Sequence, residues 1–237
     1  MKRKERYIDF TLEERIIHVI LLKSFFLNDI GLMSGKMGIL LALVEYNAQK
    51  SNKIYEDFIS ELIDDIWRNI HSGLHFGFAD GLSGIGGGIE FLIQHKAICG
   101  TSIEICAEID RKIMEVDLDR IHDTGLDTGL EGVLNYILVH IQNTVLQGEE
   151  LPFDKTYRDN LYEILKRKEC HSRESLQILI QQYLKFHVDG ILPTMTLSLK
   201  PFISNIILDR AYLEEQTLGL RQGLAGALVK NTFNYLS

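Results

Sequence analysis

Three acidic side chains stand inside or beside a glycine pattern that recurs along the chain, and they are the first candidates for chemistry. They are Asp80, Asp127 and Glu131. Two carboxylates at a suitable separation are what glycoside hydrolysis requires. Acids near a helix N-terminus also interact favourably with the helix dipole, which is a structural role. The sequence leaves both interpretations open, and together with Arg221 these acids are candidate ligand-binding residues.

Cys170 and His171 are the only adjacent pair of soft metal ligands in the sequence. A catalytic zinc site needs three protein ligands and one open position, and this pair supplies only two. Cys99 and Cys106 lie in an isoleucine-rich stretch and are interpreted as small buried hydrophobes. We therefore predict no metal site and no cofactor, and we place His171 among the ligand-binding candidates.

Phosphate-binding motifs are missing from the glycine-rich stretches. The segment GLMSGKM, which begins at Gly31, has neither the spacing nor the Ser or Thr of a P-loop. The cluster of glycines at 84–88 does not match the dinucleotide pattern GxGxxG. A formal net charge of -8 also repels phosphate backbones, so we expect no nucleic-acid partner.

The glycine pattern itself, Gly-[Leu/Phe]-x-x-Gly-x-x-Gly, occurs four times. The copies begin at Gly31, Gly77, Gly125 and Gly219. Their starts are 46, 48 and 94 residues apart, and 94 is twice 47. Self-similarity at a period of this length is typical of helical-hairpin repeats. The spacing therefore predicts about five units, one of which is degenerate and falls at about 168–176.

Each unit is predicted to hold an amphipathic helix followed by an enclosed helix that is apolar nearly all round. The amphipathic helices are expected near 11–27, 53–71, 101–119, 155–169 and 200–216. The enclosed helices are expected near 35–49, 82–96, 129–147, 172–187 and 222–235. The alternation predicts an all-α fold, an α/α toroid or barrel-like ring of about five αα-hairpins. An open α-solenoid is the alternative. Because no linker divides the chain, residues 1–237 are taken as a single domain.

The motif glycines have two structural explanations and one functional explanation. They permit either close approach of neighbouring backbones or a positive φ angle in a turn. In the functional interpretation, the N-termini of several enclosed helices converge on one mouth. Their free N–H groups and positive dipole ends would there favour an anionic or carbonyl-rich ligand.

The four repeats resemble those of the lanthionine synthetase C-like (LanC-like) proteins. The similarity rests on the stretches GLMSGKMGILLAL, GFADGLSGIGGGIEFLI, GLDTGLEGVLNYIL and LGLRQGLAGALV. It implies an α/α toroid, and in the active enzymes of the family a zinc ion at the mouth activates a peptide cysteine. The thiolate of that cysteine then adds to dehydroalanine or dehydrobutyrine and closes a thioether ring.

The zinc motifs of the family are not intact in this chain. The family holds its zinc with a Cys in a WCYGxPG-type repeat and a Cys-His pair in a CHGxxG-type repeat. Here the pair Cys170-His171 reads CHSRES, with Ser172 and Ser175 in the places of the glycines. Asp127 and Thr128 occupy the positions where a Cys ligand would stand, and no WCYG repeat exists.

The resemblance therefore implies a short LanC-like protein that is non-catalytic or zinc-free. Such a protein would bind a modified or precursor peptide, or a partner maturation enzyme, in a ribosomally synthesised modified-peptide (lantibiotic-like) pathway. The alternatives are a minimal lanthionine (thioether) cyclase or another α/α-barrel enzyme such as a glycoside hydrolase. Catalytic residues stay unassigned.

Cellular location is predicted from two features of the sequence. Three cysteines without a CxxC pair are typical of a reducing compartment and not of a disulfide-stapled scaffold. The sequence also shows no signal-peptide pattern and no uninterrupted apolar run of about 20 residues, which a membrane span requires. We therefore expect a cytoplasmic protein without a membrane partner.

Overall fold

The computed structural model describes residues 10–70, 73–169, 172–196, 198–206, 208, 211 and 213–234. Within these residues the chain forms nine α-helices and no strand. The helices are α1 (Leu12–Lys23), α2 (Lys36–Lys50), α3 (Lys53–Asn69), α4 (Leu82–Gln94), α5 (Ser102–Met114), α6 (Leu130–Leu146), α7 (Lys155–Lys168), α8 (Glu174–Asp189) and α9 (Leu224–Asn234). Single turns of 3-10 helix are η1 (Ser24–Phe26), η2 (Leu118–Arg120), η4 (Lys200–Phe202) and η5 (Leu213–Glu215). The predicted all-α class is confirmed.

The helices begin in two different ways. The helices α1, α3, α5 and α7, which we call the outer helices, each have a side chain that accepts a hydrogen bond from a backbone N–H of the first turn. These caps are Thr11, Asn52, Thr101 and Asp154. Helices α2, α4 and α6 instead begin at the motif glycines Gly35, Gly81 and Gly129, which offer no side-chain cap. Their first N–H groups therefore depend on the preceding loop.

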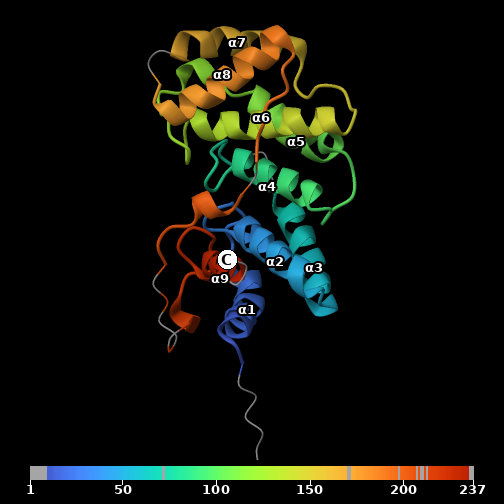
Figure 1. The fold of residues 1–237 in the computed structure, drawn as a ribbon, viewed down its shortest axis with the longest axis vertical. Helices are drawn as coiled ribbons and strands as arrows, with labels where there is room; N and C mark the ends of the chain where they lie inside the picture. Colours follow the sequence, from blue (N-terminus) through green and yellow to red (C-terminus); the bar gives the residue numbers. More distant parts are fainter. Residues whose placement is uncertain are drawn as a thin grey trace, which may run out of the picture.

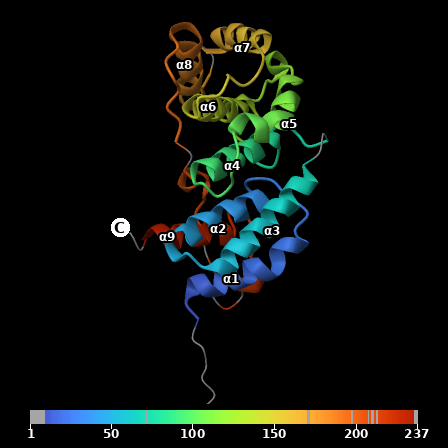
Figure 2. The same ribbon diagram turned by 90° about the vertical axis from the view of Figure 1, so that its right-hand side faces the viewer.

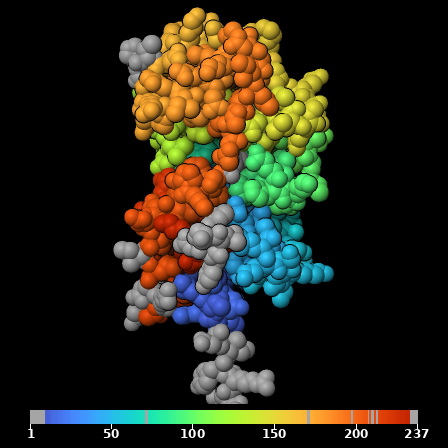
Figure 3. All heavy atoms as spheres, viewed as in Figure 1, coloured from blue at the N-terminus to red at the C-terminus, as the bar shows by residue number. Residues whose placement is uncertain are grey.

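We call α2, α4, α6, α8 and α9 the inner helices. They pack side by side in the order α9, α2, α4, α6 and α8. Helices α1, α3, α5 and α7 pack against α9, α2, α4 and α8, respectively. Figures 1 and 2 show an elongated stack with α7 and α8 at one end and α1 and α9 near the other. Figure 3 shows the same outline with all atoms drawn. The described helices thus form an open stack, because α8 and α9 lie at its opposite ends.

The prediction of an amphipathic helix over 200–216 is wrong. The described part of this segment holds only the single turns η4 and η5, and residues 203–206 are not helical. Pro201 lacks a backbone N–H, and β-branched residues lose side-chain freedom in a helix. Ile203 and Ile206 instead pack over Gly226 of α9, where the missing side chain leaves room for them. Tertiary contact has therefore overridden the helical periodicity.

The segment that connects α8 to α9 runs back along the stack, over the inner helices (Figure 1). The amide Nε2 of Gln142 on α6 donates to the carbonyl oxygen of Met195 at 3.0 Å. Further along, Leu199 is buried, and the Phe202 ring lies 5.5 Å from the Phe78 ring between their centroids. This segment therefore covers a face of the inner helices, and it helps to explain why they are apolar nearly all round.

The burial of α2, α4 and α6 agrees with the sequence, whereas the prediction of an enclosed helix at 172–187 is wrong: α8 buries only one side and leaves Ile178 and Val188 exposed. Ile39, Leu43, Leu134 and Ile137 are all at most 1% exposed. None of the helices in the described part of the chain is long and apolar enough to cross a membrane.

Replacing Leu134 with alanine is expected to lower the free energy of unfolding by about 2 to 5 kcal/mol, because a buried leucine leaves a cavity. Leu146, at the exposed end of the same helix, is the matched control. Its replacement by alanine should change stability by about 0.5 kcal/mol or less. Urea denaturation of both variants tests this, and equal losses would contradict the assignment of the inner face.

Candidate functional site

The four copies of the glycine pattern form loops of one conformation, which we call the glycine loops: residues 29–35, 75–81, 123–129 and 217–223. In each loop, the first carbonyl oxygen accepts the first N–H of the inner helix that follows. The pairs are Lys36 with Asp29, Leu82 with His75, Leu130 with Asp123 and Leu224 with Thr217, at 2.8 to 2.9 Å. At the start of α2, α4 and α9, the second N–H of the helix also donates to the second carbonyl oxygen of the loop. The first N–H groups of these helices are therefore already bonded within the loops, which argues against the functional interpretation of the motif glycines.

The glycines of these loops are required by close packing and not by positive φ. Gly35, Gly81 and Gly129 all have φ between -124° and -102°, which other residues also adopt. A β-carbon on Gly31 would lie 2.4 Å from the Cα of Asp80 in the neighbouring loop. No side chain fits at that distance, so of the two structural explanations close approach is correct.

Neighbouring glycine loops are joined by backbone hydrogen bonds at equivalent positions. Arg221 donates its N–H to the carbonyl of Met33 at 3.1 Å, and Met33 donates to Ala79 at 2.7 Å. Ala79 in turn donates to the carbonyl of Asp127 at 2.9 Å. The loops therefore stand in the order 217–223, 29–35, 75–81 and 123–129, which is the order of the inner helices.

The four glycine loops thus form a row. Two of the sequence-predicted residues contact each other directly across it. Arg221, from the last glycine loop of the chain, donates Nη1 and Nη2 to the two carboxylate oxygens of Asp127 at 2.7 and 2.5 Å. The hydrogen bonds from Arg221 lower the pKa of Asp127 below its usual value. The ion pair thus links the two ends of the row of loops, although its partners are 94 residues apart.

Asp80 lies in the same row but in a different electrostatic environment. Its Oδ1 accepts the backbone N–H of Ser34 at 3.3 Å. Burial raises the pKa of Asp80, and the nearby charge of Asp29 raises it further, whereas Arg221 opposes the shift. The row therefore carries one carboxylate held in the ionised form and one that is easier to protonate.

Of the other two predicted residues only Glu131 is described, and it is not brought to this ion pair. Glu131, in the first turn of α6, is mostly buried, and its Oε2 lies 3.7 Å from Nε of Arg173. His171 and Cys170 lie outside the described residues. The family's zinc ligands do not fit this row, because Asp127 stands where a Cys ligand is implied and both of its oxygens are bonded to Arg221.

A cleft of about 590 Å³ opens between two of the glycine loops, next to Arg221. Its polar walls include Asp29, Ser34 and Gln222, and its apolar walls include Leu27 and Leu218. An open cleft with mixed walls is suited to binding an extended segment with both charged and apolar side chains.

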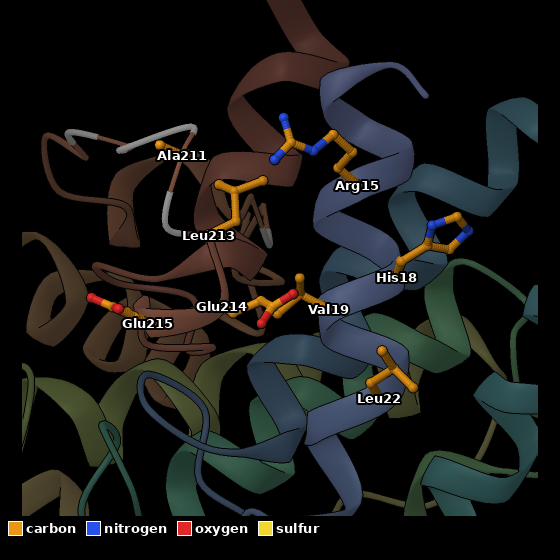
Figure 4. A pocket seen from close by; sticks show the side chains of 8 residues that line it. All are labelled: Arg15, His18, Val19, Leu22, Ala211, Leu213, Glu214 and Glu215. Atoms are coloured by element: carbon orange, nitrogen blue, oxygen red, sulfur yellow. The ribbon is translucent and has the colours of Figure 1, made fainter. Parts of the chain in front are cut away.

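A second cleft, of about 370 Å³, lies between α1 and the segment around η5 (Figure 4). Lys23 on α1 donates to the carbonyl of Glu214 beside it. The lining residues are Arg15, His18, Val19, Leu22, Ala211, Leu213, Glu214 and Glu215. None of the sequence-predicted site residues that the structure describes lines it, so we interpret this cleft as a groove left where η5 packs on α1.

The structure also contains a buried polar cluster that sequence reasoning missed. His140 on α6 lies between two carboxylates, with Nδ1 2.6 Å from Oε1 of Glu90 and Nε2 2.8 Å from Oδ2 of Asp110. Burial opposes the charged form of His140, but these hydrogen bonds outweigh it and raise the pKa to about 9. Burial also raises the pKa of the Cys106 thiol, which lies 3.6 Å from Glu90.

Further hydrogen bonds complete this cluster. Tyr136 donates its hydroxyl to Oδ1 of Asp110 at 2.5 Å. Oε2 of Glu90 accepts from Ser102 at 2.9 Å and from Asn143 at 2.5 Å. Because these groups come from α4, α5 and α6, the network fixes the relative positions of three helices. Glu90 and His140 had a sequence signal, since each is a single ionisable residue within an apolar stretch of an inner helix.

No family model, curated protein or solved structure matches this chain. Its fold and its glycine loops define a helical-repeat protein, and the LanC-like resemblance stays a prediction from the sequence motifs.

Proposed function

We propose that the chain is a short LanC-like protein that binds a peptide, or a peptide segment of a partner maturation enzyme, at the glycine loops. The observation that carries this is the cleft beside Arg221, because it combines charged and apolar walls on loops that are rigidly joined. In this proposal the protein acts in a cytoplasmic pathway that modifies a ribosomally made peptide. The helical hairpins correspond, in the same proposal, to those of the family's α/α toroid, although the described helices form an open stack.

Binding without catalysis is favoured by the state of Asp127. Both of its oxygens accept hydrogen bonds from Arg221, so neither is free to act as nucleophile or general base. Glycoside hydrolysis needs two available carboxylates, and Asp80 has no second one beside it among the predicted acids, because Glu131 is mostly buried and lies next to Arg173. A rigid ion pair that joins the ends of the row of loops is better suited to shaping a binding surface.

The charges of this surface favour a cationic peptide. Asp80 lies close enough to Asp29 for their negative charges to interact, while Arg221 is already paired with Asp127. The whole chain also carries a formal net charge of -8, which attracts basic partners. We therefore propose that a Lys or Arg side chain of the bound peptide lies next to Asp29 and Asp80.

Fluorescence anisotropy with two labelled peptides of equal length tests the proposal. One peptide carries lysines among apolar residues, and the other carries glutamates at the same positions. The lysine peptide should bind more tightly, and D80N should weaken it by about 2- to 5-fold, since exposed charge pairs contribute up to about 1 kcal/mol. D57N, at an exposed acid of α3, is the matched control. Equal binding of both peptides, or equal loss in both variants, would overturn the proposal.

A further inference from the structure

Three potential metal-ligand atoms converge in the buried cluster between α4, α5 and α6. They are Oε1 of Glu90, Sγ of Cys106 and Nδ1 of His140, and all lie within 4.8 Å of one another. All three residues are buried. This cluster is separate from the glycine loops and plays no part in the peptide site proposed above.

The atoms on the far side of the same residues are already held in place. Nε2 of His140 faces Oδ2 of Asp110 at 2.8 Å, so the imidazole nitrogen on the opposite side points to Glu90. Oε2 of Glu90 is held by Ser102 and Asn143, which leaves Oε1 toward Cys106 and His140. In zinc proteins a ligating histidine commonly donates its other N–H to a carboxylate, and ligating carboxylates are themselves hydrogen-bonded.

We propose that Glu90, Cys106 and His140 bind one Zn²⁺ ion, with Asp110 orienting the imidazole. One sulfur, one imidazole nitrogen and one carboxylate oxygen form a donor set that suits zinc. Binding releases the thiol proton of Cys106 and the proton between Nδ1 of His140 and Oε1 of Glu90. Two protons leave as the doubly charged ion enters, so the net charge of the cluster is unchanged.

The distances require only a small rearrangement. Zinc bonds of about 2.0 to 2.3 Å in a tetrahedron place the ligand atoms roughly 3.3 to 3.7 Å apart. Sγ of Cys106 and Oε1 of Glu90 are already 3.6 Å apart. Nδ1 of His140 lies 2.6 Å from Oε1, and replacing their shared proton with zinc must widen this gap by somewhat less than about 1 Å.

This proposal departs from the sequence-based expectation of no metal. That expectation rested on the incomplete pair Cys170-His171 and on the interpretation of Cys106 as a small buried hydrophobe. Cys106 is indeed buried, but it faces a carboxylate and not only apolar side chains. The same interpretation is wrong for Cys99, which is exposed. The hydrophobic periodicity of the sequence identifies α5 as an outer helix, but it does not show that the thiol of Cys106 points toward α4 and α6.

Cobalt substitution tests the site with the intact chain. The sequence has three cysteines, so the double variant C99S/C170S leaves Cys106 as its only thiol. Protein refolded with Co²⁺ should show a thiolate-to-cobalt charge-transfer band in the near ultraviolet, and C99S/C170S should keep that band. Loss of the band in C99S/C170S, or its absence in the wild type, would overturn the proposal even where a Cys106 variant fails to fold.

Elemental analysis supplies the second measurement. Wild type and C99S, purified without an affinity metal and refolded with Zn²⁺, should each hold about one zinc per chain, and C106S should hold none. D110N should weaken zinc binding by about 10- to 100-fold, because it alters the group that orients His140. Zinc retained at full stoichiometry by a folded C106S variant would place the metal elsewhere and refute this assignment.

Discussion

Replacing Gly84 with alanine is expected to prevent stable folding, whereas the same change at Gly87, about one turn further along α4, is expected to be harmless. A β-carbon on Gly84 would lie 1.8 Å from the carbonyl oxygen of Phe78. That oxygen cannot move away, because the backbone beside it is held by the hydrogen bond from Ala79 to Asp127. At Gly87 the nearest atom is on the ring of Phe78 at 3.4 Å, which is an ordinary van der Waals contact.

The two variants should therefore differ clearly in stability. Gly84→Ala should lose about 3 kcal/mol or more, through overpacking against the backbone. Gly87→Ala should be neutral or more stable by up to about 1 kcal/mol, because alanine favours a helix more than glycine does. Urea denaturation followed by circular dichroism gives both values. Similar stabilities for the two variants would show that close packing is not the reason for the third glycine of the pattern.

The glycine spacing predicted the positions of the inner helices because each loop of the pattern precedes one of them. Copies at Gly31, Gly77, Gly125 and Gly219 correctly placed α2, α4, α6 and α9. The pattern could not show which loop carbonyls the helix N–H groups bond, since this depends on the path of the loop backbone. For that reason the sequence left the structural and functional explanations of the motif glycines open.

The pairing of Asp127 with Arg221 was only half predictable. Both residues occupy equivalent positions of the glycine pattern, and this placed them at one end of the inner helices. Their direct contact depends on the last loop packing beside the loop at 29–35, and the spacing along the chain does not contain that information. The segment 200–216 shows the same limit, because its helical periodicity was overridden by packing of Ile203 and Ile206 on α9.

The buried cluster was harder to predict, because its members belong to three helices with different patterns. Glu90 and His140 each interrupt an apolar run, and a buried ionisable group needs a partner. Asp110 carries no such signal, since it lies in an amphipathic helix where an acid is normally exposed. Only the packing of α5 against α4 and α6 shows that Asp110 points inward.

Replacing His140 with leucine is expected to be the most damaging change in this cluster. Among the described residues, the ion pairs of Glu90 and Asp110 are with His140 alone. Without the imidazolium, two buried carboxylates lose their compensating charge, and removal of one partner from a buried ion pair costs about 3 to 5 kcal/mol. The stabilities of wild type and variant are measured in the presence of a chelator, so that they report on the hydrogen-bonded network without metal. His122→Leu, at an exposed position, should change stability by about 0.5 kcal/mol or less.

A triple variant separates loss of charge compensation from loss of packing. Adding E90Q and D110N to His140→Leu removes both buried negative charges and keeps an oxygen acceptor at each position. If uncompensated charge is the cause, the triple variant should be more stable than the single variant, although it carries two additional changes. Thermal and urea denaturation at neutral pH provide the comparison. A triple variant less stable than His140→Leu would mean that the shape and hydrogen bonds of the imidazole, and not its charge, hold α4, α5 and α6 together.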